Sequence, residues 1–291
     1  MTLVLSAKLN SAQQAAYKES GYHYPLRAFS EEEAEVLKQK FLAYRESSLK
    51  KINKNMIPRE QALFMMDTHW FLRWVYEIAA NQNILDAVES VLGPNILVWG
   101  TQFFPKFPGD KAYVSWHQDA AYWGLSPANV TTAWVALAES KSANGCLRVI
   151  PKSHKTELPQ RDTYAESNML SRGQEIAVDV DESQAVDFVL KPGEFSLHHV
   201  GVVHGSGPNV SDIARIGVAI RYISPDVVQK QNIRDMTILV RGKDDYHHFD
   251  LAEPPEKDME YGESKLYEEA FTRKAKRNSV DDNTNEVKGR Q

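Results

Sequence analysis

The chain has 291 residues, of which 42% are hydrophobic and 25% are charged, an ordinary composition for a globular protein with a sizeable core. The formal net charge is −5 and no basic stripe is present, so nucleic acid is not an expected partner. The single cysteine, Cys146, excludes an intrachain disulfide framework and a cysteine-cluster metal site, and the lack of a run of ~18 apolar residues argues against a membrane span.

Helical signals dominate the first third of the chain. The N-terminus lacks the basic and long apolar regions of a secretory signal, so a cytoplasmic location is expected. Ser11 is expected to cap the first helix, and Ser30 and Glu33 form a capping box before a longer one. Apolar periodicity and these end signals predict four helices, over about residues 11–20, 30–49, 68–80 and 82–92.

From residue 95 the pattern changes to short β-rich segments. Turn signals occur at residues 108–110, 144–145 and 192–193. Several short strands separated by turns are typical of a sandwich or barrel, here a jelly roll, with the N-terminal helices covering one outer face of a sheet. The predicted strands cover residues 96–104, 130–137, 146–150, 188–190, 195–204 and 213–223.

Two segments differ from this β pattern. Residues 157–185 are polar with weak periodicity, and a loop of this length inside a compact domain is usually a functional lid or disordered, so we interpret it as a mobile lid. From Arg273 the chain is charged and lacks apolar anchors, which predicts a disordered tail over 273–291. The remainder, 1–272, is expected to form one domain, with a helical part at about 11–92 and a β core at about 95–225.

His117, Asp119 and His204 are the candidate metal ligands. On an extended strand, residues two apart point to the same face, so His117 and Asp119 could reach one metal. A neighbouring strand could supply His204, 87 residues later (204 − 117). Two imidazoles and one carboxylate suit non-haem Fe(II) and leave coordination positions for substrate and O₂. A His-x-Asp triplet also occurs by chance, so the flanking residues decide its meaning.

Several motifs surround these residues in a fixed order. They are Trp116–Asp119, Thr131–Leu137, Asn144–His154, Pro192–Glu194, and His204–Asn209 followed by Arg215. In these motifs the chain resembles, from about residue 15 to 225, the phytanoyl-CoA dioxygenase family of Fe(II)/2-oxoglutarate oxygenases. The resemblance implies a mainly β fold with flanking α-helices, built on a double-stranded β-helix (jelly-roll, cupin-like) core. It also implies Fe(II), 2-oxoglutarate and O₂ as cofactor and co-substrates.

The resemblance assigns iron and 2-oxoglutarate ligands by position. His117, Asp119 and His204 match the iron ligands. Arg215 lies where the family places the arginine that pairs with the distal carboxylate of 2-oxoglutarate, and a guanidinium suits a carboxylate. The apolar run at 216–220 indicates a buried strand, and a buried arginine needs an anion.

Further positions complete the expected 2-oxoglutarate site. Ser206 matches a hydroxyl that helps hold the same carboxylate, and Thr132 and Trp134 match strand positions that line the cofactor pocket, although Trp134 could also be only a core residue. One of His198 and His199 is expected to face the cavity without binding metal. His154, in a Pro-Lys-Ser-His turn, is expected to be a structural hydrogen-bonding residue.

Gln102, Tyr122 and Trp123 are the candidate substrate-binding residues. Trp123 lies where the similar ectoine hydroxylases place a substrate-facing aromatic side chain, and Gln102 lies on the strand before the His-x-Asp motif. These residues could equally belong to the core or to a sheet edge.

The basic residues favour a small polar substrate. Lys50 to Lys54 is the only candidate for a coenzyme A phosphate site, and such runs are usually solvated. Arg148 or Arg221 could supply a cation if it faces inward. We therefore predict hydroxylation of an unactivated C–H bond in an amino acid, amine or phosphonate, with release of succinate and CO₂. Hydroxylation of an acyl-CoA or a carrier-bound substrate is the alternative.

Three other functions are considered. The chain also resembles the non-haem chlorinating enzymes in Tyr122-Trp-Gly, but those enzymes replace the carboxylate ligand with a small residue, and Asp119 fills that place here. A metal-binding cupin-like protein without oxygenase activity, for instance a Zn or Mn isomerase, would not require Arg215 and Ser206. A non-enzymatic binding module would not require the intact triad.

Overall fold

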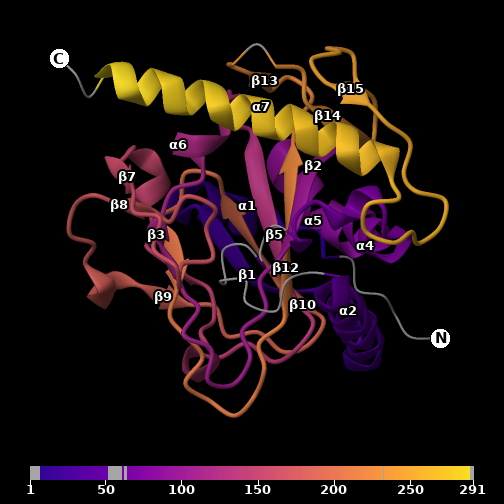
Figure 1. The fold of residues 1–291 in the computed structure, drawn as a ribbon. Coiled ribbons are helices and arrows are strands. Elements are labelled where there is room, and N and C mark those ends of the chain that lie inside the picture. Colours follow the sequence, from indigo (N-terminus) through magenta and orange to yellow (C-terminus); the bar gives the residue numbers. More distant parts are fainter. Residues whose placement is uncertain (1–6, 52–60, 62–63, 232, 289–291) are drawn as a thin grey trace.

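Two β-sheets form the centre of the computed structural model, which describes residues 7–51, 61, 64–231 and 233–288 (Figure 1). The larger sheet has the spatial order β1 (Tyr22–Arg27), β10 (Glu194–His199), β5 (Val130–Ala136), β12 (Gly217–Ile223), β2 (Ile96–Phe103), β14 (Met236–Arg241) and β15 (Asp250–Leu251). The smaller sheet has the order β3 (Val114–His117), β11 (His204–Ser206), β6 (Arg148–Val149) and β9 (Val186–Asp187). The predicted double-stranded β-helix is confirmed.

Helices flank the sheets, as expected. They are α1 (Ser11–Ser20), α2 (Glu31–Lys51), α4 (Arg73–Ala79), α5 (Gln82–Leu92), the short α6 (Ala120–Trp123) and α7 (Lys265–Lys288). Short 3₁₀ turns are η1 (Thr68–Trp70), η2 (Ser142–Asn144), η3 (Ser153–Lys155) and η4 (Glu182–Gln184). Two small antiparallel pairs complete the fold, β4 (Leu125–Ser126) with β13 (Val228–Gln229) and β7 (Gln160–Asp162) with β8 (Gln174–Ile176).

Alternation along β12 explains how the larger sheet separates a core from a cavity. Val218, Ile220 and Tyr222 are fully buried and pack with the side chains of α2, α4 and α5 on the outer face. Successive strand residues point to opposite faces, so Ala219 and Arg221 face the space between the sheets. The N-terminal helices therefore cover one outer face of the sheet, as predicted, and leave the other face for a ligand site.

The predicted helix ends are confirmed for α5 and at the start of α2, whereas two other predictions differ from the structure. The capping box of α2 is present, because Ser30 N donates to Glu33 Oε2 at 2.8 Å and Glu33 N donates to Ser30 Oγ at 3.2 Å. The first helix is capped by Asn10 and not by Ser11. The helix predicted over 68–80 is divided into η1 and α4, because the chain is extended at Leu72.

Several predicted strands are shorter in the structure. Residues 188–190 form only an isolated bridge between Leu190 and Ser140, and the strand that pairs lies at β9. The segment 195–204 is divided into β10 and β11 by a turn, and β12 begins only at Gly217. Lys50 lies on α2 and pairs with Glu46 at 2.9 Å, whereas the part of the Lys50–Lys54 cluster from residue 52 lies outside the described residues.

The segment predicted as a disordered tail from residue 273 continues α7 as far as Lys288. The helix crosses the end of the larger sheet, over β2 and β14 (Figure 1). Tyr267 and Ala270 are buried, and Arg273 Nη1 lies 2.6 Å from Asp250 Oδ2. These contacts come from residues far away in the sequence, so the charged composition alone gave no sign of them. No described helix has the length and apolar character needed to cross a membrane.

Candidate metal centre and its two cavities

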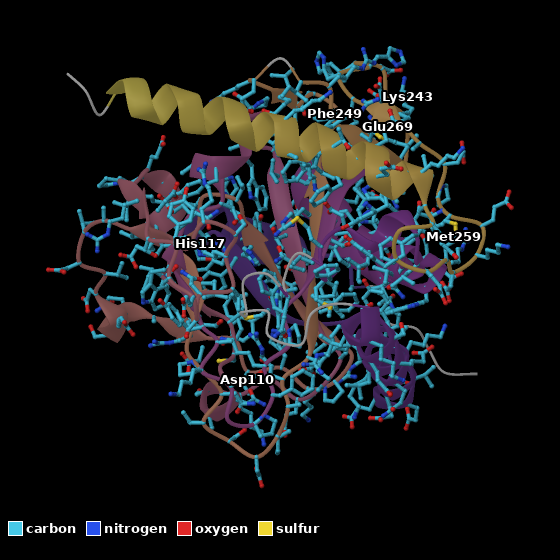
Figure 2. All side chains as sticks on the ribbon, viewed as in Figure 1. Asp110, His117, Lys243, Phe249, Met259 and Glu269 are labelled. Atoms are coloured by element: carbon cyan, nitrogen blue, oxygen red, sulfur yellow. The ribbon has the colours of Figure 1, made fainter. Side chains whose placement is uncertain are left out.

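The pairing of β3 with β11 brings the two ligand histidines together. His204 lies directly opposite His117 in the antiparallel register, and the ring centroids are 4.1 Å apart. Opposite residues of an antiparallel pair point to the same face, and here both side chains are buried; Figure 2 marks the position of His117 beside β3. The long separation in sequence is thus removed by one strand pair.

Asp119 reaches the same point by a different route from the one expected. The strand β3 ends at His117, and Asp119 is in a helical conformation (φ −59°, ψ −35°) immediately before α6. The expectation of one extended strand for both residues is therefore wrong. The turn into α6 brings Asp119 Oδ1 to 3.3 Å from His117 Nε2 and Oδ2 to 3.8 Å from His204 Nε2.

The three side chains form a compact and oriented donor set. One ligand atom from each lies within 4.8 Å of the others, and all three residues are buried. His117 Nδ1 donates to the carbonyl of Ser115 at 2.9 Å, and His204 Nδ1 donates to the carbonyl of Val202 at 2.9 Å. A histidine whose Nδ1–H is held in this way presents the lone pair of Nε2 to a metal. The geometry fits one divalent cation.

The electrostatics of the triad also fit a metal. Burial lowers the pKa of His204 to about 4, so its imidazole is neutral at neutral pH. Burial opposes the ionisation of Asp119, but its contact with His117 and the positive charge of neighbouring groups, including Arg221, lower the pKa of this carboxyl below its usual value. Neutral imidazoles and an ionised carboxylate are the forms that bind metals.

Gln118, between the ligands, holds their backbone in place. Its Nε2 donates to the carbonyls of Gly201 at 2.7 Å and Thr156 at 2.8 Å, and its Oε1 accepts from the backbone N–H of Leu158 at 2.8 Å. These bonds tie the turn after β3 to the loop before β11. Sequence reasoning did not assign Gln118 a role, and its only signal is its position between two ligands.

The inner cavity, as we call it, is a space of about 40 Å³ between the two sheets at the triad. All four residues expected to bind 2-oxoglutarate line it. Its lining comprises Phe104, Val114, His117, Asp119, Thr132, Trp134, Leu147, Leu170, His198, His204, Ser206, Arg215, Ala219 and Arg221. His198 is thus the member of the His198–His199 pair that faces the cavity.

Arg215 is the most deeply buried cation of the inner cavity, with 1% of its surface exposed. Its Nη1 donates to the carbonyl of Gly145 at 2.8 Å and its Nη2 to that of Phe104 at 2.9 Å. Among the described residues, its Nε has no hydrogen-bond partner, and the same holds for the Thr132 hydroxyl. Gly217 leaves room for the Trp134 ring beside it, since a Cβ at that position would overlap the indole.

Lys106 is a second buried cation at this end, and sequence reasoning missed it. Its Nζ donates to Ser206 Oγ at 2.6 Å and also to the carbonyls of Ser206 and Gly207. Burial and the nearby charge of Arg215 lower the pKa of Lys106 well below its usual value. Because the Ser206 hydroxyl accepts from Lys106, its own proton is available for a group in the cavity.

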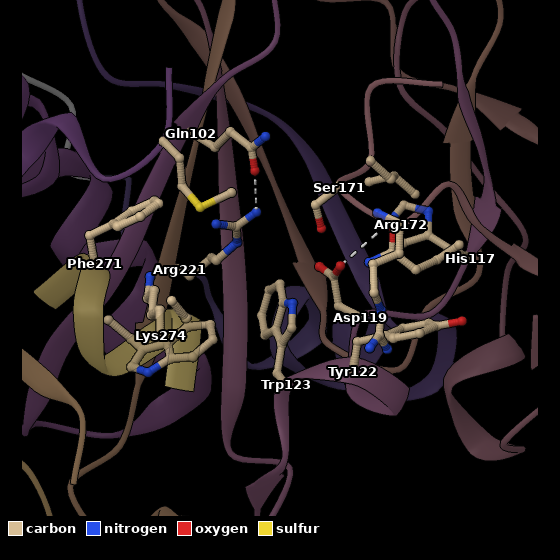
Figure 3. A pocket seen from close by; sticks show the side chains of 15 residues that line it. Gln102, His117, Asp119, Tyr122, Trp123, Ser171, Arg172, Arg221, Phe271 and Lys274 are labelled. Carbon is tan, nitrogen blue, oxygen red and sulfur yellow. Dashed lines mark hydrogen bonds and ion pairs between the residues drawn. The ribbon is translucent and has the colours of Figure 1, made fainter. Parts of the chain in front are cut away.

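The outer cavity, as we call it, is a space of about 180 Å³ that shares His117 and Asp119 with the inner cavity (Figure 3). All three candidate substrate residues line it. Its lining comprises Met66, Trp99, Gln102, His117, Asp119, Tyr122, Trp123, Leu170, Ser171, Arg172, Gln174, Arg221, Phe271, Lys274 and Ala275. Arg221 is thus the inward-facing cation of the two considered, because Arg148 lines neither cavity and pairs with Glu182 and Asp187.

Part of the wall of the outer cavity comes from two segments in which the sequence predicted no individual site residue. Leu170, Ser171 and Arg172 come from the loop between β7 and β8, inside the predicted lid. Phe271 and Lys274 come from α7. In the sequence analysis, Phe271 belonged to the end of the predicted domain and Lys274 to the predicted disordered tail. His154 lines neither cavity, and its Nε2 contacts the carbonyl of Lys18 at 3.2 Å, as expected for a structural residue.

The chain combines a double-stranded β-helix with two histidines and one carboxylate that lie between two cavities. This combination is typical of a class of metal-binding β proteins. A sequence model of the phytanoyl-CoA dioxygenase (PhyH) family matches residues 17–217, and the chain belongs to this family. The resemblance found in the sequence is therefore confirmed.

Known proteins similar to the chain agree with this assignment. A probable alpha-ketoglutarate-dependent hypophosphite dioxygenase of Stutzerimonas stutzeri is 30% identical over 162 residues, which are 54% of this chain and 56% of that protein. The peroxisomal phytanoyl-CoA dioxygenase of Homo sapiens is 30% identical over 148 residues, 49% of this chain and 44% of that protein. The chain spans about half the length of these curated relatives. The apo structure of the non-heme monooxygenase ThoJ has a TM-score of 0.77 and 33% identity, covering 92% of this chain and 98% of ThoJ.

Proposed function

We propose that the protein is an Fe(II)- and 2-oxoglutarate-dependent dioxygenase that hydroxylates an unactivated C–H bond of a small polar substrate, such as an amino acid, amine or phosphonate. The observation that carries this proposal is the meeting of two cavities at one 2-His-1-carboxylate set, with His117 and Asp119 in the walls of both. One cavity has the donors for a dicarboxylate, and the other has room for a second molecule.

Iron bound with 2-oxoglutarate supplies the oxidising chemistry, in which O₂ and 2-oxoglutarate are consumed, succinate and CO₂ are released, and one oxygen atom enters the substrate. His117, Asp119 and His204 would hold the ion. The Ser115 and Val202 carbonyls fix both imidazole rings, so the ligands need little rearrangement on binding. Two ligand histidines and one carboxylate leave positions open on the ion for the reacting molecules.

The inner cavity would hold 2-oxoglutarate. Arg215 and Lys106 are two buried basic groups near one another, an arrangement that is costly unless an anion joins them. An unpaired buried donor destabilises the folded protein by about 1–3 kcal/mol. Arg215 Nε and the Thr132 hydroxyl are two such donors, and a bound carboxylate would remove this destabilisation. Ser206, held by Lys106, would donate to the same group. The apolar side chains of the lining, among them Phe104 and Leu147, would favour exclusion of water from this end.

The outer cavity supports a small substrate over an acyl-CoA. Its volume of about 180 Å³ is below the roughly 300–1,000 Å³ of pockets that hold drug-sized ligands. Its lining is rich in aromatic, amide and basic side chains, which suit a compact polar molecule. An acyl-CoA remains the second candidate, because curated relatives are named as phytanoyl-CoA dioxygenases.

A metal-binding protein without oxygenase activity is the candidate of another class. Such a protein would need the triad but would not need Arg215, Lys106 and Ser206 around a second cavity. These residues therefore favour the oxygenase.

Succinate release tests the proposal. The protein is supplied with Fe(II), 2-oxoglutarate and O₂ and is assayed over a panel of amino acids, amines, phosphonates and short acyl-CoAs. We expect stimulated succinate release and a product with one added oxygen for a small polar compound. Stimulation by acyl-CoAs alone would support the second candidate, and metal binding without 2-oxoglutarate turnover would contradict the oxygenase assignment.

Asp119 further predicts hydroxylation and not chlorination. Its carboxylate takes the ligand position that a halide would need. Turnover in high chloride should therefore give a product with one added oxygen by mass spectrometry. A chlorinated main product would show that Asp119 does not hold the metal during turnover.

A further inference from the structure

His198, on β10, is a buried polar side chain of the inner cavity that is not part of the candidate metal-ligand triad. Only 2% of its surface is exposed, and it lines the cavity. Its ring lies 4.8 Å from that of His204, measured between centroids. Among the described residues, its Nδ1 has no hydrogen-bond partner. A buried polar atom without a partner is rare in a folded protein, and a ligand bound in the cavity would provide the partner.

The fold does not explain why residue 198 is polar. His204 needs no support from His198, because its Nδ1 already donates to the carbonyl of Val202 at 2.9 Å. The contribution of β10 to the hydrophobic core comes from Phe195 and Leu197, which are fully buried and belong to the cluster on the outer face. An apolar ring at position 198 would fill the same space without leaving a polar atom unpaired. The imidazole is therefore best explained by a ligand.

The strand register places His198 in a row of polar residues at the metal end of the inner cavity. His198 lies directly opposite Thr132 of β5, and Thr132 in turn lies opposite Arg221 of β12. Opposite residues of antiparallel strands point to the same face, and all three line this cavity. The Thr132 hydroxyl, like His198 Nδ1, has no hydrogen-bond partner within the described part of the chain. His198 and Thr132 thus offer adjacent polar atoms to a ligand beside the metal.

Arg215 marks the other end of the inner cavity. Its guanidinium carbon lies 5.3 Å from the centroid of the Trp134 ring. Trp134 is two residues beyond Thr132 on the same face of β5, which is roughly 7 Å along the strand. The two carboxylates of 2-oxoglutarate are separated by a comparable interval. A molecule with its distal carboxylate at Arg215 would therefore bring its oxo group and its other carboxylate to the row of His198 and Thr132.

We propose that His198 recognises the oxo-acid end of 2-oxoglutarate, by a hydrogen bond from its imidazole to the carboxylate that adjoins the oxo group. This inference rests on the proposed function and assigns the two ends of the co-substrate to separate residues. Arg215 binds the distal carboxylate, and His198 binds the carboxylate at the metal. The hydrogen bond holds the oxo acid in one orientation on the metal. A 2-oxo acid that lacks the distal carboxylate therefore still depends on His198 and no longer on Arg215.

Binding of two probes without turnover tests this proposal. The protein is loaded with Fe(II) under anaerobic conditions and titrated with 2-oxoglutarate or with 2-oxobutyrate, which lacks the distal carboxylate. The readout is the visible absorption band that a 2-oxo acid gives when it chelates Fe(II). His198→Phe keeps a ring and loses the hydrogen bond, so the Kd of both probes should rise about tenfold or more, the size expected for a hydrogen bond to a charged group. An unchanged Kd for 2-oxobutyrate would overturn the proposal.

Two further variants assign the effect to a hydrogen bond at this end of the cavity. Arg215→Ala should weaken 2-oxoglutarate and leave the Kd of 2-oxobutyrate unchanged, which is the opposite pattern to that of a general loss of the site. His198→Asn places an amide close to the position of Nδ1, so it should bind 2-oxobutyrate more tightly than His198→Phe does. Equal Kd values for the Asn and Phe variants would overturn the proposal, because the wild-type contact would then not be a hydrogen bond.

Metal binding separates recognition of the oxo acid from an effect through His204. Without 2-oxoglutarate, the Ni(II) affinity of His198→Phe, measured by calorimetry, should equal that of the wild type. A fall as large as the loss in the titration would overturn the proposal, because His198 would then act by positioning His204. If His198→Phe does not fold, His198→Leu gives the same comparison with a smaller side chain.

The result is separable from the proposed function. A wild-type protein that binds Fe(II) but no 2-oxo acid would contradict both the proposed function and this inference. A wild-type protein that binds 2-oxoglutarate, together with a His198→Phe variant that binds both probes equally well, would contradict this inference alone.

Discussion

The inner and outer cavities share His117, Asp119, Leu170 and Arg221 but differ in the origin of their remaining walls. The inner cavity is formed by strands and loops that lie, except for Ala219 and Arg221, within residues 17–217, the span matched by the family. The outer cavity also takes residues from α7, beyond that span. Under the proposed function, the residues for the reaction therefore lie mostly within the span shared by the family, and the residues for the substrate come partly from α7 outside it.

The largest effect is expected where the two cavities meet. His204→Ala removes one of the three proposed metal ligands, so turnover should be lost and metal affinity should fall about tenfold or more, since changing even the outer partners of metal ligands causes losses of this size. Calorimetry with Ni(II) and succinate release measure the two effects. His248→Ala, an exposed histidine, is the control. Full metal affinity in His204→Ala would contradict the ligand assignment.

The second largest effect should be confined to the inner cavity. Arg215→Ala should raise the KM for 2-oxoglutarate strongly, because breaking a buried charge pair costs roughly 3–5 kcal/mol. Substrate affinity measured at saturating 2-oxoglutarate should change little. Because Arg215 also bonds two backbone carbonyls, circular dichroism checks the fold. An unchanged KM would show that another cation, Lys106 or Arg221, binds the carboxylate of 2-oxoglutarate.

A smaller effect should be confined to the outer cavity. Asp67→Asn and Lys274→Met each break the buried ion pair that holds α7, so each should raise the substrate KM about tenfold or less and leave the 2-oxoglutarate KM unchanged. In the double variant, the loss of substrate affinity expressed as a free energy should be smaller than the sum of the two single losses, because no unpaired buried charge remains. Additive losses, or a change in the 2-oxoglutarate KM, would show that α7 does not act through this pair.

The smallest effect concerns the predicted lid over residues 157–185. The segment contains the β7–β8 pair, and Arg172 from its loop lines the outer cavity. Trypsin should cut after Arg172 in the free protein and more slowly when metal, 2-oxoglutarate and substrate are bound, since lids close over bound ligands. Lys243, in an exposed segment, is the internal control. Cleavage after Arg172 that is indifferent to ligands would identify a fixed wall.

Short-range patterns determined much of the fold and the reaction class. The capping box at Ser30 depends on residues three apart, and the strand patterns depend on neighbours two apart, so both can be read without tertiary contacts. The order of motifs around His117, Asp119 and His204 indicated the family. All ten residues assigned to the site from sequence line one of the two cavities.

Only the tertiary structure decided which charged residues are buried in the site. Lys106, Arg172 and Lys274 look like solvated residues in sequence, because their partners Ser206, Asp162 and Asp67 lie 100, 10 and 207 residues away. The same applies to Asp119, whose approach to the histidines depends on the turn into α6 and not on strand alternation. Local sequence determines backbone period and turns, whereas the burial of a charge depends on which distant segment covers it, and that is fixed only when the whole chain has folded.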